Sequence, residues 1–243
     1  MQKPQSENSN TSAFGSIRII PFLFLISILS IVSIGFRSGI LKKKLREGII
    51  EFSCVPVDTA KTNFLTAPTN MTMEFKNDYY AYVEECGMGF ARMKFIADPI
   101  KKEFITSLFF FEKKQSVLDS IGIRETNYYL PNYEVEYGNK TKNIAGYQCK
   151  NAILEFKNGD PSYEVWFTRK IDIKNPNWAN AYYKIDGVLL DYRLKKFGLN
   201  LHFIATKVSP SKIDDSYFTI PEEYEIIKNS ELEKMMEGFF SDN

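Results

Sequence analysis

Three cysteines and one histidine are the residues of this chain whose types most often act as nucleophiles, redox centres or metal ligands. Cys54, Cys86 and Cys149 show no Cys-x-x-Cys spacing, and His202 lies in an apolar, strand-like run. A zinc site needs Cys or His ligands at short spacings, and a catalytic base needs a partner that orients it. We therefore expect His202 to be an ordinary strand residue and Cys149 a small buried side chain. In an oxidising compartment Cys86 and Cys149 could pair, if their Cβ atoms meet.

Adjacent carboxylates are a second chemical feature. Asp214 and Asp215 could bind a hard cation, but two carboxylates without further oxygen ligands are a weak indication, and turn chemistry explains them as well. The sequence holds no Gly-x-Ser-x-Gly motif and no phosphate-binding glycine loop. We therefore predict no enzyme activity, no cofactor and no metal.

Large apolar side chains are a third feature, and they suggest binding rather than catalysis. Methionine and aromatic residues can line an adaptable cavity for an acyl chain or another apolar ligand. Core packing predicts the same residues, and we favour it as the simpler explanation. The residues that would line such a cavity are Met71, Met73, Phe75, Phe109, Phe111, Trp166 and Trp178.

The first 46 residues indicate membrane targeting. Residues 1–16 are polar, and we expect them to be disordered. Residues 17–36 are almost continuously apolar, about the length that crosses a bilayer core, and lack the polar face of a surface helix. This run is either a cleaved signal peptide, with Ser33 and Gly35 before the cut, or an uncleaved membrane anchor. Residues 37–46 form a basic linker, which we interpret as a solvated spacer.

Charge is distributed unevenly along the chain. The net charge of +1 conceals a body, residues 47–243, with 24 basic and 29 acidic residues and a net charge of −5. Such a body repels phosphate backbones, which disfavours nucleic-acid binding. The five basic residues of the linker outnumber those before the apolar run, and by the positive-inside tendency they would keep the body of an anchored protein in the cytoplasm.

Period-two alternation of apolar and polar residues predicts one β-rich domain over residues 47–243. Asn-Asp at 77–78 and Asn-Gly at 158–159 are turn signals between alternating runs. Residues 144–208 predict four strands of one antiparallel sheet. The expected strands cover 49–57, 70–76, 79–85, 90–97, 102–111, 114–119, 133–137, 146–156, 162–168, 187–194 and 199–208.

Helical signals occur at two places. Residues 120–132 could contain a helical turn. Near the C-terminus, Ser230 and Glu233 fit a capping box, and an apolar stripe at helical spacing follows. We expect this helix to cover the sheet.

Several motifs of this domain occur together: NIAGYQCKNA (143–152), YEVWFT (163–168), NPNW (175–178), GVLLDY (187–192) and DDSYFTIP (214–221), with MTMEFK (71–76) and GMG (87–89) before them. In these motifs the chain resembles an uncharacterised family of Bacteroidetes envelope proteins, the GLPGLI-type proteins. The resemblance implies a fold like that of the outer-membrane lipoprotein carriers (LolA/LolB-like): a mainly β (α+β) protein with a curved antiparallel sheet, or half-barrel, and packed helices. It also implies export, and it supplies no catalytic residues.

The charge of the linker favours a cytoplasmic body, but because of the resemblance we expect an exported envelope protein, either periplasmic or tethered to the inner membrane and facing the periplasm. We expect it to bind a lipid or another apolar ligand in the curved sheet. The alternative is a structural or interaction module with a filled core and no ligand. These alternatives differ in whether the concave side of the sheet is hollow.

Overall fold

The structure, a computed structural model, describes residues 44–58, 65–126 and 132–241. The predicted disordered segment 1–16, the apolar run 17–36 and most of the basic linker lie outside the described residues. Within the described residues, none of the helices combines the length and the apolar character needed to cross a membrane.

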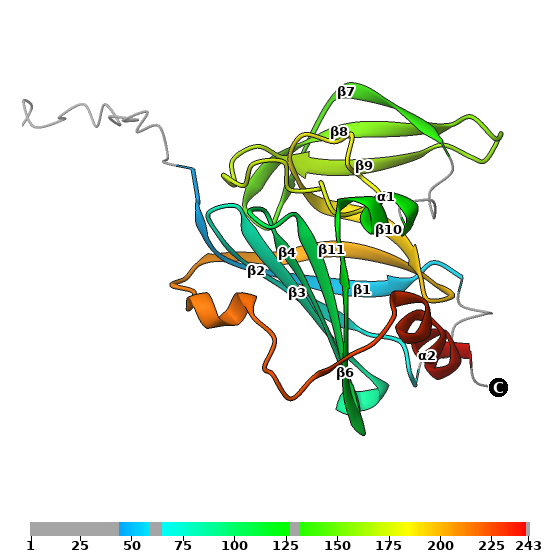
Figure 1. The fold of residues 1–243 in the computed structure, drawn as a ribbon. Helices are drawn as coiled ribbons and strands as arrows, with labels where there is room; N and C mark the ends of the chain where they lie inside the picture. Colours follow the sequence, from blue (N-terminus) through cyan, green and yellow to red (C-terminus); the bar gives the residue numbers. More distant parts are fainter. Residues whose placement is uncertain (1–43, 59–64, 127–131, 242–243) are drawn as a thin grey trace, which may run out of the picture. The chain divides into compact units, whose positions relative to one another are not determined.

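Twelve strands form one curved sheet that does not close on itself (Figure 1). Side by side, they are β12 (Glu225–Ile226), β6 (Glu112–Leu118), β5 (Glu103–Phe110), β4 (Ala91–Asp98), β3 (Tyr79–Cys86), β2 (Asn70–Lys76), β1 (Glu47–Pro56), β11 (Leu199–Pro210), β10 (Val188–Lys196), β9 (Tyr163–Thr168), β8 (Tyr147–Phe156) and β7 (Tyr133–Ile144). All neighbours are antiparallel except β12 and β6, which are parallel. The predicted fold class is confirmed, and residues 144–208 supply β8 to β11.

The sheet consists of two meanders that meet at their first and last strands. β1 to β6 follow one another across one half, and β7 to β11 across the other. The halves join where β1 pairs with β11, from Gly48 opposite Pro210 to Pro56 opposite Leu201. Pairing between such distant segments brings the two ends of the domain into the middle of the sheet.

Short turns connect most neighbouring strands. Asn77 between β2 and β3 has a φ of 56°, and Gly159 between β8 and β9 has a φ of 83°. Phe197 and Gly198 between β10 and β11 have φ values of 51° and 76°. Two consecutive left-handed residues match the twist of an antiparallel hairpin, so the turn signals at these sites act as the sequence predicts.

The core lies on the concave side of the sheet, and helices cover part of it. Met71, Met73 and Phe75 alternate with polar residues in β2 and are all buried. Helix α1 (Ser120–Thr126) follows β6 in the chain, and helix α2 (Asn229–Ser241) contacts β6. The apolar stripe of α2 enters the core with Leu232, Met236 and Phe240. The connection between β9 and β10, residues 169–187, adds further buried residues.

Two short 3₁₀ helices complete the described elements. η1 (Gly87–Gly89) links β3 to β4, and η3 (Asp215–Phe218) contacts β3 and β4. The Asp214 carboxylate caps η3 by accepting a hydrogen bond of 2.8 Å from the Ser216 backbone N–H. The Asp215 carboxylate lies 2.7 Å from the Lys76 ammonium. This pair of carboxylates therefore serves a helix end and an ion pair.

Most strand boundaries lie within two residues of the predicted ones, but those of β7 and the start of α2 call for an explanation. β7 extends beyond the predicted 133–137, and its register with β8 shifts between Tyr137 and Thr141. At Gly138 in this shift a Cβ atom would lie 2.3 Å from the Asn151 side-chain amide, so only glycine fits without movement. Helix α2 begins at Asn229, which places Ser230 inside the first turn rather than at the cap.

Candidate functional site

The concave side of the sheet contains a cavity of about 120 Å³. Its wall is built by strands β2 to β6, β10 and β11, by the last residue of α1, by residues 179–182 and by α2. An apolar cavity of about 150 Å³ is large enough to take up benzene. The cavity therefore has room for a group of about the size of one small ring or a short aliphatic chain.

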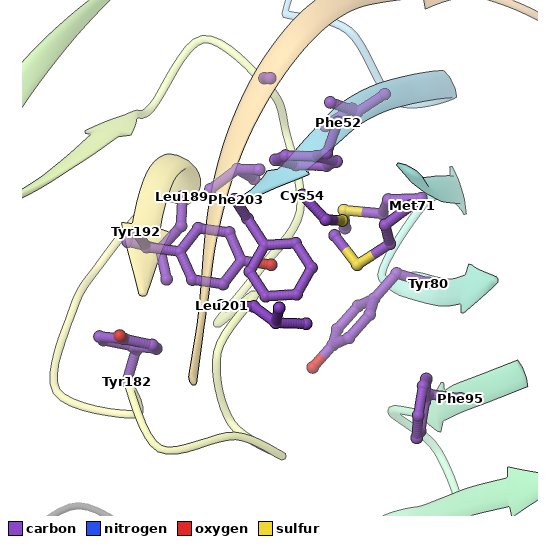
Figure 2. Packing of buried hydrophobic residues seen from close by; sticks show 14 of the residues in the cluster. Phe52, Cys54, Met71, Tyr80, Phe95, Tyr182, Leu189, Tyr192, Leu201 and Phe203 are labelled. Carbon is purple, nitrogen blue, oxygen red and sulfur yellow. The ribbon is translucent and has the colours of Figure 1, made fainter. Parts of the chain in front are cut away.

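Aromatic side chains form much of the wall. Tyr192 stacks on Phe203 across the β10–β11 pair, with ring centroids 5.2 Å apart. Figure 2 shows the Tyr80 hydroxyl directed toward the space between Leu201 and Phe95. This hydroxyl is buried and makes no hydrogen bond of ordinary geometry among the described residues, although it lies near the backbone of Ala179.

Glu84 is the acidic residue of the β3 wall. It shares the inward face of β3 with Tyr80 and Tyr82 and lies opposite Met71 of β2 and Met93 of β4. Only 8% of Glu84 is exposed, and within the described residues its carboxyl group has no hydrogen bond or ion pair. Burial raises its pKa to about 7, and the positive charge of Lys196 opposes this effect.

Lys196, the last residue of β10, is the basic counterpart. Its ammonium group faces three phenylalanine rings, with centroid distances of 4.3 Å to Phe95, 4.7 Å to Phe197 and 5.6 Å to Phe104. Burial lowers its pKa to about 8, while Glu84 and Glu233 of α2 act in the opposite direction. Lys196 is half-buried and is one of the residues that line the cavity. Like Glu84, it forms no ion pair within the described residues.

The turn that holds Lys196 in place is conformationally unusual. Phe197 has a φ of 51°, a left-handed conformation that bulky residues rarely adopt. Its side chain is nevertheless buried and stacks on Phe95 at 6.5 Å. Strained backbone of this kind persists where surrounding contacts hold it, and such positions cluster at ligand sites. Here the strain places both Phe197 and Lys196 at the cavity wall.

Unpartnered polar groups in an apolar cavity are energetically unfavourable. Each buried donor or acceptor without a hydrogen bond costs about 1–3 kcal/mol, and a charged group costs more. The Tyr80 hydroxyl is such a group, whereas Glu84 and Lys196, which line the same cavity, keep some accessible surface. Their arrangement is suited to a bound molecule that carries polar atoms, and acid and base pKa values near 7 and 8 allow proton transfer close to neutral pH.

A second polar cluster lies around Asp191 in β10. The His202 Nε2 atom is 2.6 Å from one Asp191 carboxylate oxygen, and the Lys142 ammonium is 2.9 Å from the other. His202 is a residue of β11, and its carboxylate partner comes from the neighbouring strand β10, where spacing along the sequence does not show it. Each oxygen of this buried carboxylate thus has a partner from a neighbouring side chain, which explains the cluster as a structural network.

The three cysteines are free and buried, so the suggested Cys86–Cys149 disulfide is not formed. Cys86 lies in β3 and Cys149 in β8, and five other strands separate β3 from β8 in the sheet. Burial raises the pKa of Cys149 to about 11, and burial together with the nearby Glu84 charge raises the pKa of the Cys54 and Cys86 thiols. Raised pKa values disfavour the reactive thiolate form.

Of the seven residues suggested to line an apolar site, Met71 lines the cavity. Met73 and Phe75 lie deeper in the core. Trp178 packs against the core beside Lys102, and Trp166 lies beside Lys142.

Phe109 and Phe111 were placed on the wrong side. In β5, Phe104 and Thr106 line the cavity, so alternation turns Phe109 outward, where it is 43% exposed. Phe111 occupies the turn to β6, with a φ of 57°, and is 86% exposed. A continuous apolar run hides the alternation that would have shown which side chains face inward.

Sequence reasoning missed Glu84 and Lys196, although a signal for each existed. Glu84 continues the alternation of Tyr80 and Tyr82, and Lys196 continues that of Tyr192 and Leu194. A charged residue at an inward position of an alternating strand marks a buried charge. The sequence contained no sign that the two residues share one cavity.

Within the residues that the structure covers, no group of three or more His, Cys, Asp or Glu side chains is arranged to hold a metal ion. No protein-family model and no curated protein matches the chain.

Among solved structures, the chain is similar to PNGF-II in two crystal forms. One superposes with a TM-score of 0.50 and 16% sequence identity, over 79% of this chain and 33% of that one. The other gives 0.49 and 16%, over 78% of this chain and 32% of that one. The chain thus spans about a third of the length of PNGF-II. At this identity the similarity concerns the fold alone: part of PNGF-II has a fold similar to that of this chain.

Proposed function

We propose that this protein is a non-enzymatic binding protein that holds a small, largely apolar ligand between its curved sheet and helix α2. The cavity of about 120 Å³ with unpartnered Glu84 is the observation that carries the proposal. A filled core would have left no such space, and a core without a ligand would gain stability from an apolar residue at this position.

The size of the cavity restricts the ligand. Sites for drug-sized molecules have volumes of about 300–1,000 Å³, so the cavity as it stands accepts a smaller molecule. A complete lipid acyl chain would need α2 to move outward. The proposal therefore concerns a short-chain or single-ring ligand.

The place of action is part of the same proposal. The resemblance to GLPGLI-type envelope proteins and the apolar run 17–36 support export to the periplasm, either free or tethered to the inner membrane. Export is tested with two reporters fused to the C-terminus, one that is active only in the periplasm and one that is active only in the cytoplasm. The periplasmic reporter is expected to be active, and activity of the cytoplasmic reporter instead would contradict export.

The alternative, an interaction module that uses its C-terminal helix, has less support. The apolar stripe of α2 is buried in the core through Leu232, Met236 and Phe240, so it offers no free apolar face. Removing α2 would expose the core rather than a partner site.

Binding is tested with methionine methyl groups as reporters. Met71 and Met93 line the cavity, whereas Met88 lies outside it and is 79% exposed. Titration with hexan-1-ol is expected to shift the NMR signals of Met71 and Met93 and to leave that of Met88 unchanged. The variant Thr106→Leu fills part of the cavity and is expected to weaken the response. Equal shifts at all three methyl groups, or none, would contradict the proposal.

A further inference from the structure

We infer that the ligand of this cavity carries a carboxylate, which Lys196 and Glu84 recognise together. The inference rests on the proposed function and adds the chemical class of the ligand. It is carried by two oppositely charged side chains that line one apolar cavity, form no hydrogen bond with any described residue and do not pair with each other.

Lys196 decides the polarity of the ligand. A lysine ammonium has three donors and no acceptor, and none of these donors is used by a described residue. Three phenylalanine ring faces stabilise the positive charge but cannot accept strong hydrogen bonds. A ligand group that satisfies Lys196 must therefore be an acceptor, and an anionic acceptor forms the strongest bond.

Glu84 and Tyr80 complete the recognition. A carboxyl group that is buried among Tyr and Met side chains keeps its proton more readily than one in water. In that protonated form it can donate to an oxygen of the ligand, and the buried Tyr80 hydroxyl, which lies near the Ala179 backbone, is a further donor on the same wall. A carboxylate has two oxygens with several acceptor sites, so it can accept from Lys196 and from these neutral donors at once.

Other head groups fit less well. An amine would be repelled by Lys196, and an alcohol offers one oxygen and no charge. The apolar remainder of the wall, with Leu201 and Phe203 of β11, suits a short hydrocarbon tail. The ligand class is therefore a small monocarboxylate with an aliphatic or aromatic tail.

The pH dependence follows from the groups that face Glu84 and Lys196. Glu84 binds the carboxylate when it is protonated, so affinity falls as pH rises through about 7, and it falls further as Lys196 loses its proton near pH 8. The remaining titratable groups around the pair are the β3 residues Tyr80, Tyr82 and Cys86, Cys54 of β1, Tyr192 and Lys195 of β10, Tyr182, and Glu233 of α2. Tyrosine and cysteine stay neutral here, because burial raises each of their pKa values.

The test compares hexanoate, hexan-1-ol and hexylamine, which share one tail and differ in the head group. Dissociation constants are measured on the full chain at pH 6.5 from the Met71 and Met93 methyl signals. Hexanoate is expected to bind at least about tenfold more tightly than hexan-1-ol, as one charge-assisted hydrogen bond predicts, and hexylamine most weakly. Hexanoate binding is also expected to weaken between pH 6 and pH 8.5.

Variants separate the two charged residues. Lys196→Met is expected to remove the preference for hexanoate over hexan-1-ol, and Glu84→Gln to flatten the change in affinity through pH 7. Lys150→Met replaces an exposed strand lysine by the same residue type as Lys196→Met and serves as its matched control.

The outcomes are distinguishable. If none of the three compounds binds, the proposed function fails. If hexan-1-ol binds as tightly as hexanoate, or hexylamine binds most tightly, the function stands and the carboxylate inference is overturned. The head-group comparison uses the wild-type chain, so it remains decisive if a variant does not fold.

Discussion

Substituting Glu84 by glutamine should make the protein more stable at neutral and alkaline pH. The carboxyl group has an ordinary pKa of 4.5 when exposed, and burial raises this pKa to about 7 in the folded chain. Between these values the folded state binds more protons than the unfolded state, so the free energy of unfolding falls as pH rises. Glutamine has almost the same shape and does not ionise.

The magnitude follows from the same two pKa values. Each pKa unit corresponds to about 1.4 kcal/mol, so ionisation of Glu84 costs the wild type at most about 3 kcal/mol between pH 4 and pH 8. Because the Glu84 charge also stabilises the Lys196 ammonium, its removal returns somewhat less than this amount. At a urea dependence of about 3 kcal/mol per molar, the advantage of Glu84→Gln reaches up to about 1 M in unfolding midpoint at pH 8.

The measurement is urea unfolding of both proteins at several pH values from 4 to 8. The difference in unfolding midpoint between Glu84→Gln and the wild type should be small at pH 4 and grow until about pH 7. Glu85→Gln removes a carboxylate from an exposed position of the same strand and should not reproduce this growth. A difference between Glu84→Gln and wild type that stays constant from pH 4 to pH 8 would show that Glu84 ionises as it does in water, and would refute the argument.

Three further outcomes are expected. Met236→Ala should lower the free energy of unfolding by about 2–5 kcal/mol, because Met236 is fully buried in the core, whereas the exposed Glu237→Ala should change it little; equal effects in thermal melts would place α2 outside the core. Gly238→Ala should raise it by about 0.5–1 kcal/mol, since a Cβ atom there meets nothing within 4 Å in a helix; destabilisation would contradict the helix. Iodoacetamide at pH 8 should leave all three buried thiols unmodified in the folded protein and alkylate them all after denaturation without reductant; mass spectrometry showing fewer than three adducts would indicate a disulfide.

Local patterns in the sequence predicted much of this fold. Alternation in residues 70–85 defined the β2–β3 hairpin, and the Asn77 and Gly159 turns were visible as turn residues. The pairing of β1 with β11 was not visible, because nothing in either segment identifies the other. Long-range pairing depends on how whole meanders pack, which a local pattern does not contain.

The candidate site was harder to predict, for a related reason. Glu84 and Lys196 come from different meanders, and each is next to an exposed residue of the same charge, Glu85 or Lys195. From the sequence alone, all four of these charged residues would be expected at the surface. The strand register and the pairing of β1 with β11 are what bring Glu84 and Lys196 to the same cavity.

The position of β1 has a consequence for how the protein is made. When a ribosome has synthesised β1 to β6, one flank of that growing sheet still lacks its neighbour, and that neighbour, Leu199–Pro210, emerges much later. Until then the backbone N–H and C=O groups along Glu47–Pro56 are free to pair with strands of other nascent chains. Completion also requires closing a very long loop, which slows the final step. We therefore expect this chain to depend on a holding chaperone during synthesis, and to aggregate when translation stops before residue 199.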